Sequence, residues 1–476
     1  MRTPSHNARL GSGTTITRRR FLGCASLAAT SAIAPWIIPG AARGADGAVP
    51  PSERITVGII GIGVMGGFGV MGSSGPRGGH LRFLAGQPAV QLLAVCDVDR
   101  ERRETARAFV EESYASGRAR GTFRGCSAYN DYREILARPD IDAVLISTPD
   151  HWHALQAIDA AKAGKDIYCE KPVCMTIREG RTLVETVRSH ARVFQTGSQY
   201  RSISRIRRVC EFVRAGGLGR VKSVFTIWGR NGVPSDPALP AEPVPQGLDW
   251  DLWVGPAVWR PYNRRYHRNP PPGVVPWSFC DAFGLSAVTG YHSHAADVIQ
   301  YALGMETSGP VEIIHPADGE FPTMTCRYAN GTLLHHVDNW DMVKDVYGAV
   351  PSTAGLRGNF GGLFVGERGW LTSMSGVGSG RLEGSPETLF TEMELWSRQE
   401  ALANNHHANW FDCIRTRAQP SSHEEIGHRS ASVGLLVIAA HKLGRSLKWD
   451  PIKEAFVGDE AANRVLSRAL REPWRV

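Results

Sequence analysis

The feature that most constrains the fold is a glycine-rich turn directly after a short apolar run. The run is Ile55–Ile60, and the turn reads Gly61-Ile62-Gly63-Val64-Met65-Gly66. In this pattern the first glycine makes a tight turn, the second lets a pyrophosphate approach the backbone, and the third allows close packing. N–H groups at the start of the following helix bind the phosphates. A purely structural glycine turn is the alternative. The residues that we expect at a dinucleotide are Gly61, Gly63, Val64, Met65 and Gly66.

Strands and helices alternate over the next part of the chain. Further strands are expected at 90–96, 143–147, 166–169 and 193–196. Helical patterns fall at 100–112, 132–137, 152–163 and 177–189. Because such alternation builds a parallel sheet with helices on both faces, we expect a Rossmann dinucleotide-binding domain over residues 52–200. The predicted fold class is therefore α/β.

The pattern changes after about residue 215. Strand-like runs follow at 221–228, 311–315, 323–328, 332–337 and 370–373. They suggest that residues 201–476 form a C-terminal α+β domain for substrate binding and oligomerisation, with a large, mostly antiparallel open sheet.

A long segment rich in Pro and Trp, residues 231–276, lies between the first two of these runs. Irregular segments of this length in compact domains usually cover a site or a neighbour. Aromatic side chains here are predicted either to stack on sugar rings or to pack in the core or an interface. They are Trp250, Trp253, Trp259 and Trp277.

An acidic residue ends the second expected strand. Asp97 is placed to accept hydrogen bonds from the adenosine ribose, and a carboxylate there disfavours a 2′-phosphate, so NAD is preferred over NADP. Asp97 follows Gly61 by 36 residues, whereas the usual spacing is about 20. The excess is a glycine-rich insertion, 67–79. Asp99 is a competing candidate, and a solvated Asp97 is the alternative.

A polar loop follows the buried strand 143–147. Its sequence is Thr148-Pro149-Asp150-His151-Trp152-His153. At the start of a helix in the crevice of a parallel sheet, this loop is expected to approach the nicotinamide ribose through Thr148, Pro149 and His151. Asp150 is alternatively a helix N-cap, and His153 a residue on the helix surface.

The tripeptide Glu170-Lys171-Pro172 follows the strand 166–169. A lysine at the carboxyl end of a parallel strand points into the crevice where such sheets bind ligands. Lys171 is therefore expected to orient a substrate hydroxyl and to stabilise developing alkoxide charge, with Glu170 and Lys171 both beside the cofactor. A surface lysine is the alternative.

The N-terminus is typical of an export signal. Residues 1–45 contain six arginines and no Asp or Glu, so they account for six units of the net charge of +8 and leave a net charge of +2 for the rest of the chain. This near-neutral remainder gives no reason to expect nucleic-acid binding. The arginines Arg18, Arg19 and Arg20 precede an apolar stretch, 21–38, and small residues. We expect export by the twin-arginine machinery to the periplasm; an uncleaved anchor or a disordered tail is the alternative.

Together these motifs resemble the Gfo/Idh/MocA oxidoreductase family, in its exported bacterial branch. The resemblance includes the glycine turn, Cys96-Asp97-Val98-Asp99, the Thr148–His153 loop, Glu170-Lys171-Pro172 and several C-terminal segments. These segments are Leu248–Pro261, Gly427–Ser430, Leu447–Asp450 and Arg471–Trp474. The resemblance implies a Rossmann domain and a second domain whose open sheet packs against another subunit, so a homodimer or homotetramer is expected.

The resemblance also implies a second catalytic cluster, Asp-x-Gly-x-His-x-x-Asp, opposite the lysine. His294 and Asp297 match it, but Gly290 and His292 stand where the first Asp and the Gly would be. His294 is the expected proton acceptor. The missing carboxylate could be replaced by His292, Tyr291 or Asp281. His292, His294 and Asp297 could alternatively bind a metal, although the resemblance implies none.

The sequence therefore predicts an exported NAD-dependent oxidoreductase that takes hydride from a hydroxyl carbon of a sugar, cyclitol or glycoside. One alternative is a glycosidase or lyase that uses resident NAD in an oxidation–elimination–reduction cycle. Another is a non-catalytic protein that binds a sugar or nucleotide. The pair His406-His407 is expected to serve packing only.

Overall fold

The computed structural model describes residues 49, 53–67, 79–119, 121–228, 234–267, 277–286, 290, 292–344, 350, 356, 361–373, 382–396 and 405–476. The chain divides into two compact units, residues 1–52 and 53–476, and the second contains both sheets. The predicted export signal, residues 1–45, lies outside the described residues, as do Tyr291 and most of the glycine-rich insertion. Within the described ranges, no helix is both long and apolar enough to cross a membrane.

The N-terminal sheet has six parallel strands in the order β3-β2-β1-β4-β5-β6. The strands are β1 (Ile55–Ile60), β2 (Val90–Cys96), β3 (Ser127–Tyr129), β4 (Ala143–Ile146), β5 (Asp166–Cys169) and β6 (Phe194–Thr196). The order reverses at β1, where parallel sheets of this kind bind ligands. The predicted doubly wound Rossmann sheet is thus confirmed.

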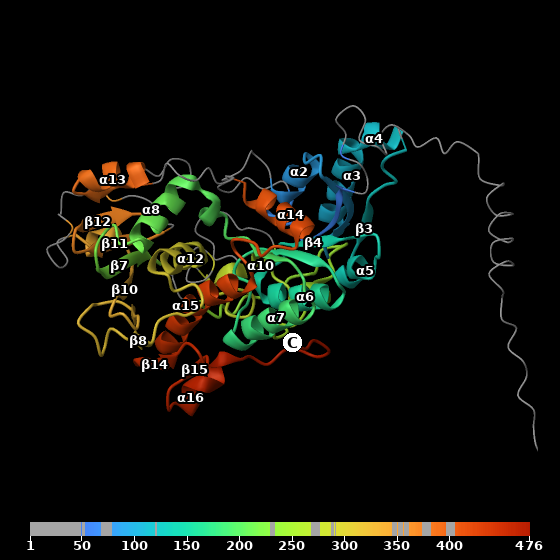
Figure 1. Cartoon of the computed structure of the whole chain (residues 1–476). Helices are drawn as coiled ribbons and strands as arrows, with labels where there is room; N and C mark the ends of the chain where they lie inside the picture. The colour runs from blue at the N-terminus through green and yellow to red at the C-terminus, as the bar shows by residue number, and fades with distance from the viewer. Residues whose placement is uncertain are drawn as a thin grey trace, which may run out of the picture. The chain divides into compact units, whose positions relative to one another are not determined.

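Helices cover both faces of this sheet (Figure 1). They are α2 (His80–Ala85), α3 (Arg100–Ser113), α4 (Ala115–Ala119), α5 (Tyr132–Leu136), α6 (Asp150–Lys162) and α7 (Ile177–Ser189). Side-chain caps fix three of the starts: Asp99 accepts the N–H of Glu101 at α3, Asp131 accepts that of Arg133 at α5, and Thr176 accepts that of Glu179 at α7. The sequence did not predict β3, which is three residues long and only half-buried.

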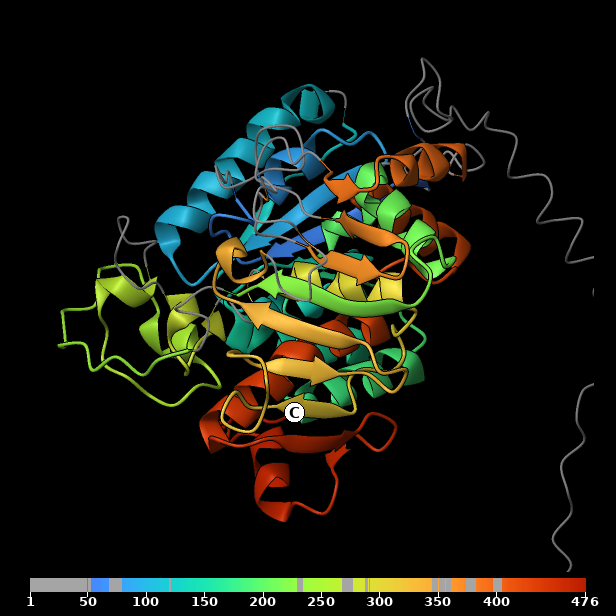
Figure 2. The ribbon, with the colours of Figure 1, turned by 90° about the vertical axis from the view of Figure 1, so that its left-hand side faces the viewer.

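The C-terminal sheet has nine strands in the order β13-β12-β11-β7-β10-β9-β8-β14-β15. Its neighbouring strands are antiparallel except β7 and β10, which are parallel, so the predicted mostly antiparallel sheet is confirmed (Figure 2). The strands are β7 (Val221–Ile227), β8 (Glu312–Ile314), β9 (Thr325–Arg327), β10 (Leu333–Val337), β11 (Leu363–Gly366), β12 (Gly369–Thr372), β13 (Gly384–Ser385), β14 (Leu447–Asp450) and β15 (Ala455–Phe456).

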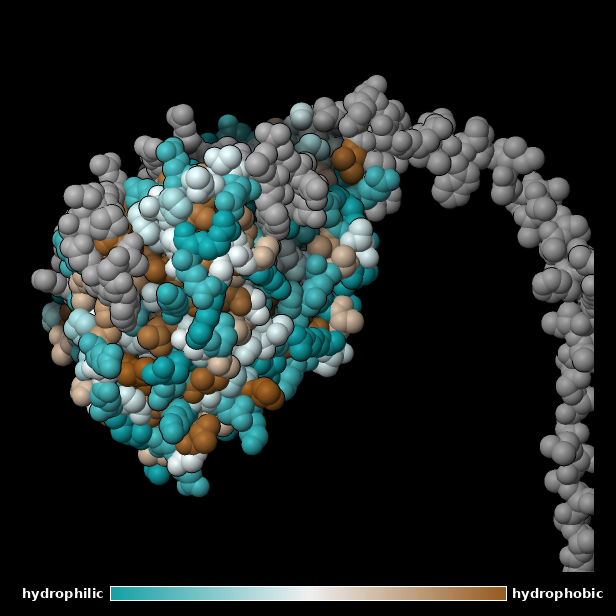
Figure 3. Space-filling view, turned by 60° about the vertical axis from the view of Figure 1, so that its left-hand side comes forward, coloured by the Kyte–Doolittle hydropathy of each residue, from teal (hydrophilic) through white to brown (hydrophobic). Residues whose placement is uncertain are grey.

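Alternate side chains of this sheet enter two different cores. Val224, Leu334 and Phe364 belong to the main hydrophobic core, together with residues of α8 (Ser204–Arg214), α12 (His292–Leu303) and α15 (Glu424–Leu443). Their neighbours Phe225 and Leu363 form a smaller buried cluster on the opposite face, together with Val343 and Val350. The space-filling view, turned partly toward this side, shows apolar residues interspersed with hydrophilic ones (Figure 3).

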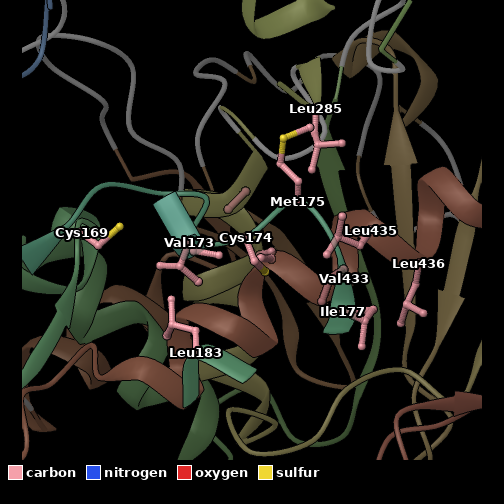
Figure 4. Packing of buried hydrophobic residues seen from close by; sticks show 14 of the residues in the cluster. Cys169, Val173, Cys174, Met175, Ile177, Leu183, Leu285, Val433, Leu435 and Leu436 are labelled. Carbon is pink, nitrogen blue, oxygen red and sulfur yellow. The ribbon is translucent and has the colours of Figure 1, made fainter. Parts of the chain in front are cut away.

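The main core joins the two halves of the chain. Figure 4 shows residues from the link between β5 and α7, such as Val173 and Cys174, near Leu435 and Leu436 of α15. A second core receives Trp410 and Phe411 from α14 (His406–Thr416), which packs with strands of the N-terminal sheet and with α2. α14 therefore returns from late in the sequence to the Rossmann domain. The remaining α-helices are α9 (Trp250–Val254), α10 (Arg264–His267), α13 (Thr388–Trp396) and α16 (Glu460–Asn463).

Candidate active site

The three glycines of the turn are required for different reasons. A Cβ atom on Gly61, whose φ is +90°, would lie 2.8 Å from the backbone of Ser147, and one on Gly66 would lie 1.9 Å from the carbonyl oxygen of Gly61. Among the described residues, a Cβ on Gly63 would meet only Arg102 Nη1, at 3.9 Å. The first and third glycines therefore permit backbone packing, whereas the second borders open space. This open space fits the close approach of a dinucleotide pyrophosphate.

Backbone hydrogen bonds connect α2 directly to the glycine turn, although the glycine-rich insertion separates them in the sequence. His80 N donates to Met65 O at 2.9 Å and Leu81 N donates to Gly66 O at 3.0 Å. These bonds join α2 to the glycine turn as though the intervening residues were absent. The insertion explains why Asp97 follows Gly61 at an unusual distance in the sequence.

Asp97 connects the glycine turn to β2. Its Oδ2 accepts the N–H of Ile62 at 2.7 Å and its Oδ1 accepts the N–H of Asp99 at 2.8 Å. Burial raises the pKa of Asp97. Each carboxylate oxygen has a second lone pair, so Asp97 stays the predicted partner of the ribose.

Asp99, the competing candidate, has other partners. Besides capping α3, its carboxylate lies 3.1 Å from His267 Nε2 of α10. The hydrogen bond from His267 lowers the pKa of Asp99 to about 2, against the opposing effect of burial. Asp99 therefore fixes α3 and the Trp-rich segment to each other.

The loop after β4 is half-buried at Thr148 and Pro149 and buried from Asp150 onward. Thr148 Oγ1 donates to Gln156 Oε1 at 2.8 Å, and Pro149 is the N-cap residue of α6, without a side-chain cap bond. The His151 ring lies 3.2 Å from Phe283 O and 3.1 Å from Trp253 O. Burial lowers the pKa of His151 to about 3, so the ring is neutral at pH 7. Its contacts anchor the Trp-rich segment, and its role at a cofactor stays a prediction.

His153 is also buried, so it is not a surface residue of α6. Its Nδ1 lies 2.7 Å from Pro172 O and its Nε2 lies 2.8 Å from Thr148 O. The ring therefore connects the loop after β4 to the residues after β5. These are the two strand ends where the sequence places the nicotinamide.

Lys171 is fixed from the C-terminal domain. Its Nζ donates to Gly290 O at 2.8 Å, and the Lys171–Pro172 peptide bond is cis. Gly290 stands where the family motif has an aspartate, and it supplies its backbone carbonyl to Lys171 instead.

Glu170 is the centre of a buried polar network. Its Oε1 lies 2.9 Å from His80 Nε2 and accepts from Gln199 Nε2 at 2.8 Å. Burial favours the neutral acid, but the hydrogen bond and charge of His80 outweigh burial and bring the pKa of Glu170 to about 2. His80 Nδ1 in turn lies 3.0 Å from His407 Nε2. Glu170 is therefore an anion held beside Lys171.

His294 and Lys171 act on each other electrostatically. Burial, followed by the positive charge of Lys171, lowers the pKa of His294 well below its ordinary value. The ring packs edge-on against Tyr200, with ring centroids 4.6 Å apart. His292 is buried as well, with its ring centroid 4.8 Å from that of His336. Both imidazoles belong to the start of α12.

Asp297 is bound by other residues of the protein. Its two oxygens accept from Arg201 Nε at 2.8 and 2.7 Å, and Ser430 Oγ donates to Oδ1 at 3.1 Å. Arg201 also pairs with Glu306 at 2.6 Å. Asp297 therefore connects α12 to α15 and to the 3-10 helix Gln199–Ser202. Its catalytic role stays a prediction that these contacts do not favour.

Two features of the site were not predicted from the sequence. His407, expected to serve packing only, reaches the Glu170 network through His80. His406 binds Thr196 O and Ser202 Oγ, each at 2.8 Å. His80 follows the glycine-rich insertion and has no motif of its own. No sequence signal links these distant histidines to Glu170.

The Trp-rich segment packs along the carboxyl ends of β2 and β4. Asp249 N donates to Val98 O at 3.0 Å, and Trp152 Nε1 donates to Trp253 O at 3.1 Å. Trp250 and Trp253 stack at 4.6 Å within an aromatic cluster. These two indoles are core residues, whereas Trp259 is 51% exposed.

Two models of one family match most of the chain. The Gfo/Idh/MocA model described as "Oxidoreductase family, NAD-binding Rossmann fold" matches residues 55–198. The model of the same family's C-terminal alpha/beta domain matches residues 227–368 and 393–476.

Curated relatives match over shorter stretches. A glycosyl hydrolase family 109 protein from Shewanella pealeana is 31% identical over 182 residues, which are 36% of this chain and 37% of that protein. A levoglucosan dehydrogenase from Pseudarthrobacter phenanthrenivorans is 37% identical over 94 residues, 20% of this chain and 24% of that protein. The chain thus matches less than half the length of either relative.

Solved structures share the fold at low identity. The WlbA dehydrogenase from Bordetella pertussis, in complex with NADH and UDP-GlcNAcA, has a TM-score of 0.52 and 16% identity, and covers 84% of this chain and 98% of its own. The aldose-aldose oxidoreductase from Caulobacter crescentus has a TM-score of 0.50 and 16% identity, covering 83% and 99%. Since the family models match both domains, the chain belongs to the Gfo/Idh/MocA oxidoreductase family, with an NAD-binding Rossmann domain and the family's C-terminal α/β domain.

Proposed function

We propose that the protein is an NAD-dependent oxidoreductase acting on a hydroxyl carbon of a sugar, cyclitol or glycoside. Family membership supports the reaction type, and the similarity to a levoglucosan dehydrogenase supports a carbohydrate substrate. The open space beside Gly63 and the buried Asp97 suit NAD in preference to NADP. When bound, NAD supplies an acceptor for hydride from the carbinol carbon.

The single observation that carries this proposal is the placement of Lys171. Its ammonium group lies at the carboxyl end of β5 and is fixed by Gly290 O at 2.8 Å. A fixed cation at a strand end can donate a hydrogen bond to a substrate oxygen and stabilise negative charge as the oxygen loses its proton. Glu170, held as an anion, balances the lysine charge and keeps this part of the site rigid.

The test uses the Lys171→Ala variant, a carbohydrate panel and nicotinamide absorbance. We expect the variant to lose about 100-fold or more in kcat on any substrate that the wild type oxidises, because the cation that stabilises the alkoxide is gone. NAD affinity, measured by calorimetry, should change little. Lys162→Ala, at the exposed end of α6, is the matched control. Full turnover by Lys171→Ala would contradict the proposed role.

A second candidate is cleavage of a glycosidic bond with resident NAD. The similarity to a glycosyl hydrolase family 109 protein favours it. In this reaction, transient oxidation of the sugar acidifies the neighbouring C–H, and elimination releases the leaving group. Product analysis by mass spectrometry separates the two candidates, because cleavage proceeds without accumulation of NADH. NAD that survives purification but is never reduced, with no product from any sugar, would instead support a non-catalytic binding protein.

We also infer that the protein is exported to the periplasm through the twin-arginine machinery, and that it forms a homodimer or homotetramer. The arginine pattern before the apolar stretch supports export, and membership of a family whose open sheet is expected to pack against another subunit supports assembly. Replacing Arg18 and Arg19 by Lys should leave the protein in the cytoplasm. Native mass spectrometry of the exported protein measures both subunit number and bound dinucleotide.

A further inference from the structure

Asp150 is a buried carboxylate with one unsatisfied oxygen. It is the first residue of α6, and only 6% of it is exposed. One oxygen accepts the N–H of Leu285, whereas Oδ2 has no hydrogen-bond partner within the described part of the chain. Buried polar atoms in folded proteins are nearly always bonded, and exceptions need an explanation such as a ligand or a catalytic role.

The same short segment of the C-terminal half holds both Asp150 and Lys171. Leu285 N–H binds the Asp150 carboxylate. Its neighbour Ser286 accepts the N–H of Gly290 at 2.8 Å, and Gly290 O accepts from Lys171 Nζ at 2.8 Å. Among charged groups, Lys171 has the strongest effect on Asp150. The start of α6 and the end of β5 therefore bring a carboxylate and an ammonium group to one place.

The other groups proposed as proton acceptors are less suitable. His294 is buried beside the positive charge of Lys171, which disfavours an imidazolium ion. Asp297 binds Arg201 through both oxygens. Asp281, a residue that could replace the missing carboxylate, forms a surface ion pair with Lys442 at 2.8 Å.

We propose that Asp150 accepts the substrate hydroxyl proton and so supplies the carboxylate that the family motif places at position 290. This inference rests on the proposed function. As the carbinol carbon becomes a carbonyl, its hydrogen leaves with two electrons for the oxidised dinucleotide, and the hydroxyl proton moves to Asp150 Oδ2. Lys171 stabilises the oxygen during the transfer. The proton then passes to solvent, which returns Asp150 to its anionic form.

The acidity of Asp150 suits this role. Burial raises its pKa to about 7, although Lys171 and the Leu285 N–H oppose the shift and Glu170 adds to it. A general base is most effective when its pKa lies near the working pH. Glu170 and Lys171 lie at the end of β5, and the buried thiol of Cys169 also interacts with Asp150. Within the described part of the chain, these three groups interact electrostatically with the Asp150 carboxylate.

The first test needs no substrate. We expect infrared spectra of the dinucleotide-free protein to show a carboxylic-acid C=O band that disappears with a midpoint of about pH 7. The band should be absent in Asp150→Asn and unchanged in the control Asp281→Asn. Asn keeps one oxygen for the Leu285 N–H, and thermal melting of the unloaded variant checks that it folds. Identical titrations of wild type and Asp150→Asn would overturn the assignment.

The second test measures turnover against pH on a substrate that the wild type oxidises. Asp150→Asn should lose about 100-fold in kcat and the rise in kcat/KM near pH 7, while NAD affinity stays within about twofold. Asp281→Asn should retain the wild-type profile. A wild-type profile in Asp150→Asn overturns the proposal even if the infrared band is present. If the wild type oxidises no carbohydrate, the proposed function fails, and the catalytic role of Asp150 fails with it. The infrared band would then show only that Asp150 titrates near pH 7.

Discussion

Two glycines of one motif can be needed for different physical reasons. Gly66 packs against Gly61 O, and Gly63 borders open space. The motif assigns approach of the pyrophosphate to the second glycine and close packing to the third. The structure separates a residue that the fold requires from one that the ligand requires.

This difference gives a prediction for two variants at the residue scale. Gly66→Ala should destabilise the unloaded protein, because its Cβ would lie 1.9 Å from a carbonyl oxygen. Gly63→Ala should melt at nearly the wild-type temperature, because no atom of the described residues lies closer than 3.9 Å to its Cβ. It should nevertheless weaken NAD binding at least about tenfold, since the methyl group occupies the space for the pyrophosphate. Thermal melting and calorimetry measure the two effects; tight NAD binding by Gly63→Ala would contradict the assignment.

Residue-level prediction from the sequence was best where a motif and a strand end coincide. Lys171 follows β5, and the sequence placed it in the crevice for that reason. His80 has no such signal, and Asp150, although it lies in the loop after β4, was expected at most to cap a helix. Their importance depends on Glu170 and Lys171, which are 90 and 21 residues away in the sequence. Only the packing of α2 and α6 brings these groups together.

At the scale of elements, α7 and α15 are joined by a network of buried charges. Arg181 of α7 donates to Glu425 at 2.8 Å and to Glu454 at 2.8 Å. Arg429 also binds Glu425, at 2.8 Å. Both glutamate side chains are less than one-tenth exposed, so each depends on its arginine partners.

Arg181→Ala is predicted to lower the free energy of unfolding by about 3 kcal/mol at pH 7, because it leaves buried carboxylates short of a partner. Burial raises the pKa of Glu425, but Arg181 and Arg429 outweigh it and bring the pKa to about 2, below the ordinary 4.5. The stabilisation is therefore complete above pH 4.5 and is lost as pH falls toward 2. Denaturant titrations across this range should show the gap between wild type and variant narrowing in acid. Arg178→Ala, exposed on the same helix, is the control; an equal effect there would contradict the prediction.

Elements with strong periodicity were predicted closely, and short ones were not. β1, β2, β5 and α7 begin and end where the sequence placed them. β11, β13 and β15 were not predicted, because a strand of two to four residues has too few alternating positions to show a pattern. Their conformation depends on neighbouring strands of the nine-stranded sheet.

At the scale of the whole molecule, segments far apart in sequence cover the candidate site. The last residues of the chain hold the Trp-rich segment against the Rossmann helices. Arg468 pairs with Glu179 at 2.6 Å, Arg471 pairs with Asp251 at 2.6 Å, and Trp474 packs against Trp152 with ring centroids 4.8 Å apart.

Removal of residues 468–476 should therefore loosen the Trp-rich segment. We expect the free energy of unfolding to fall by about 2 kcal/mol or more, because several charged hydrogen bonds and an aromatic contact are lost together. Limited proteolysis should cut within residues 234–267 faster than in the intact chain. Arg475→Ala, whose side chain is 81% exposed, should behave as the wild type. Equal cleavage rates in the truncated and intact chains would show that the tail does not hold the segment.

The sequence by itself determined the Rossmann domain, the position of the glycine turn and the placement of Lys171 at the end of β5. These features follow from local periodicity and from glycines and a strand end within a few residues of each other. Only the tertiary structure decided that Gly290 supplies a carbonyl to Lys171 and that Asp297 is bound by Arg201. It also decided that Asp150 is buried with one oxygen that has no hydrogen-bond partner among the described residues. The reason is physical: a carboxylate's acidity and availability depend on burial and on partners that are distant in the chain.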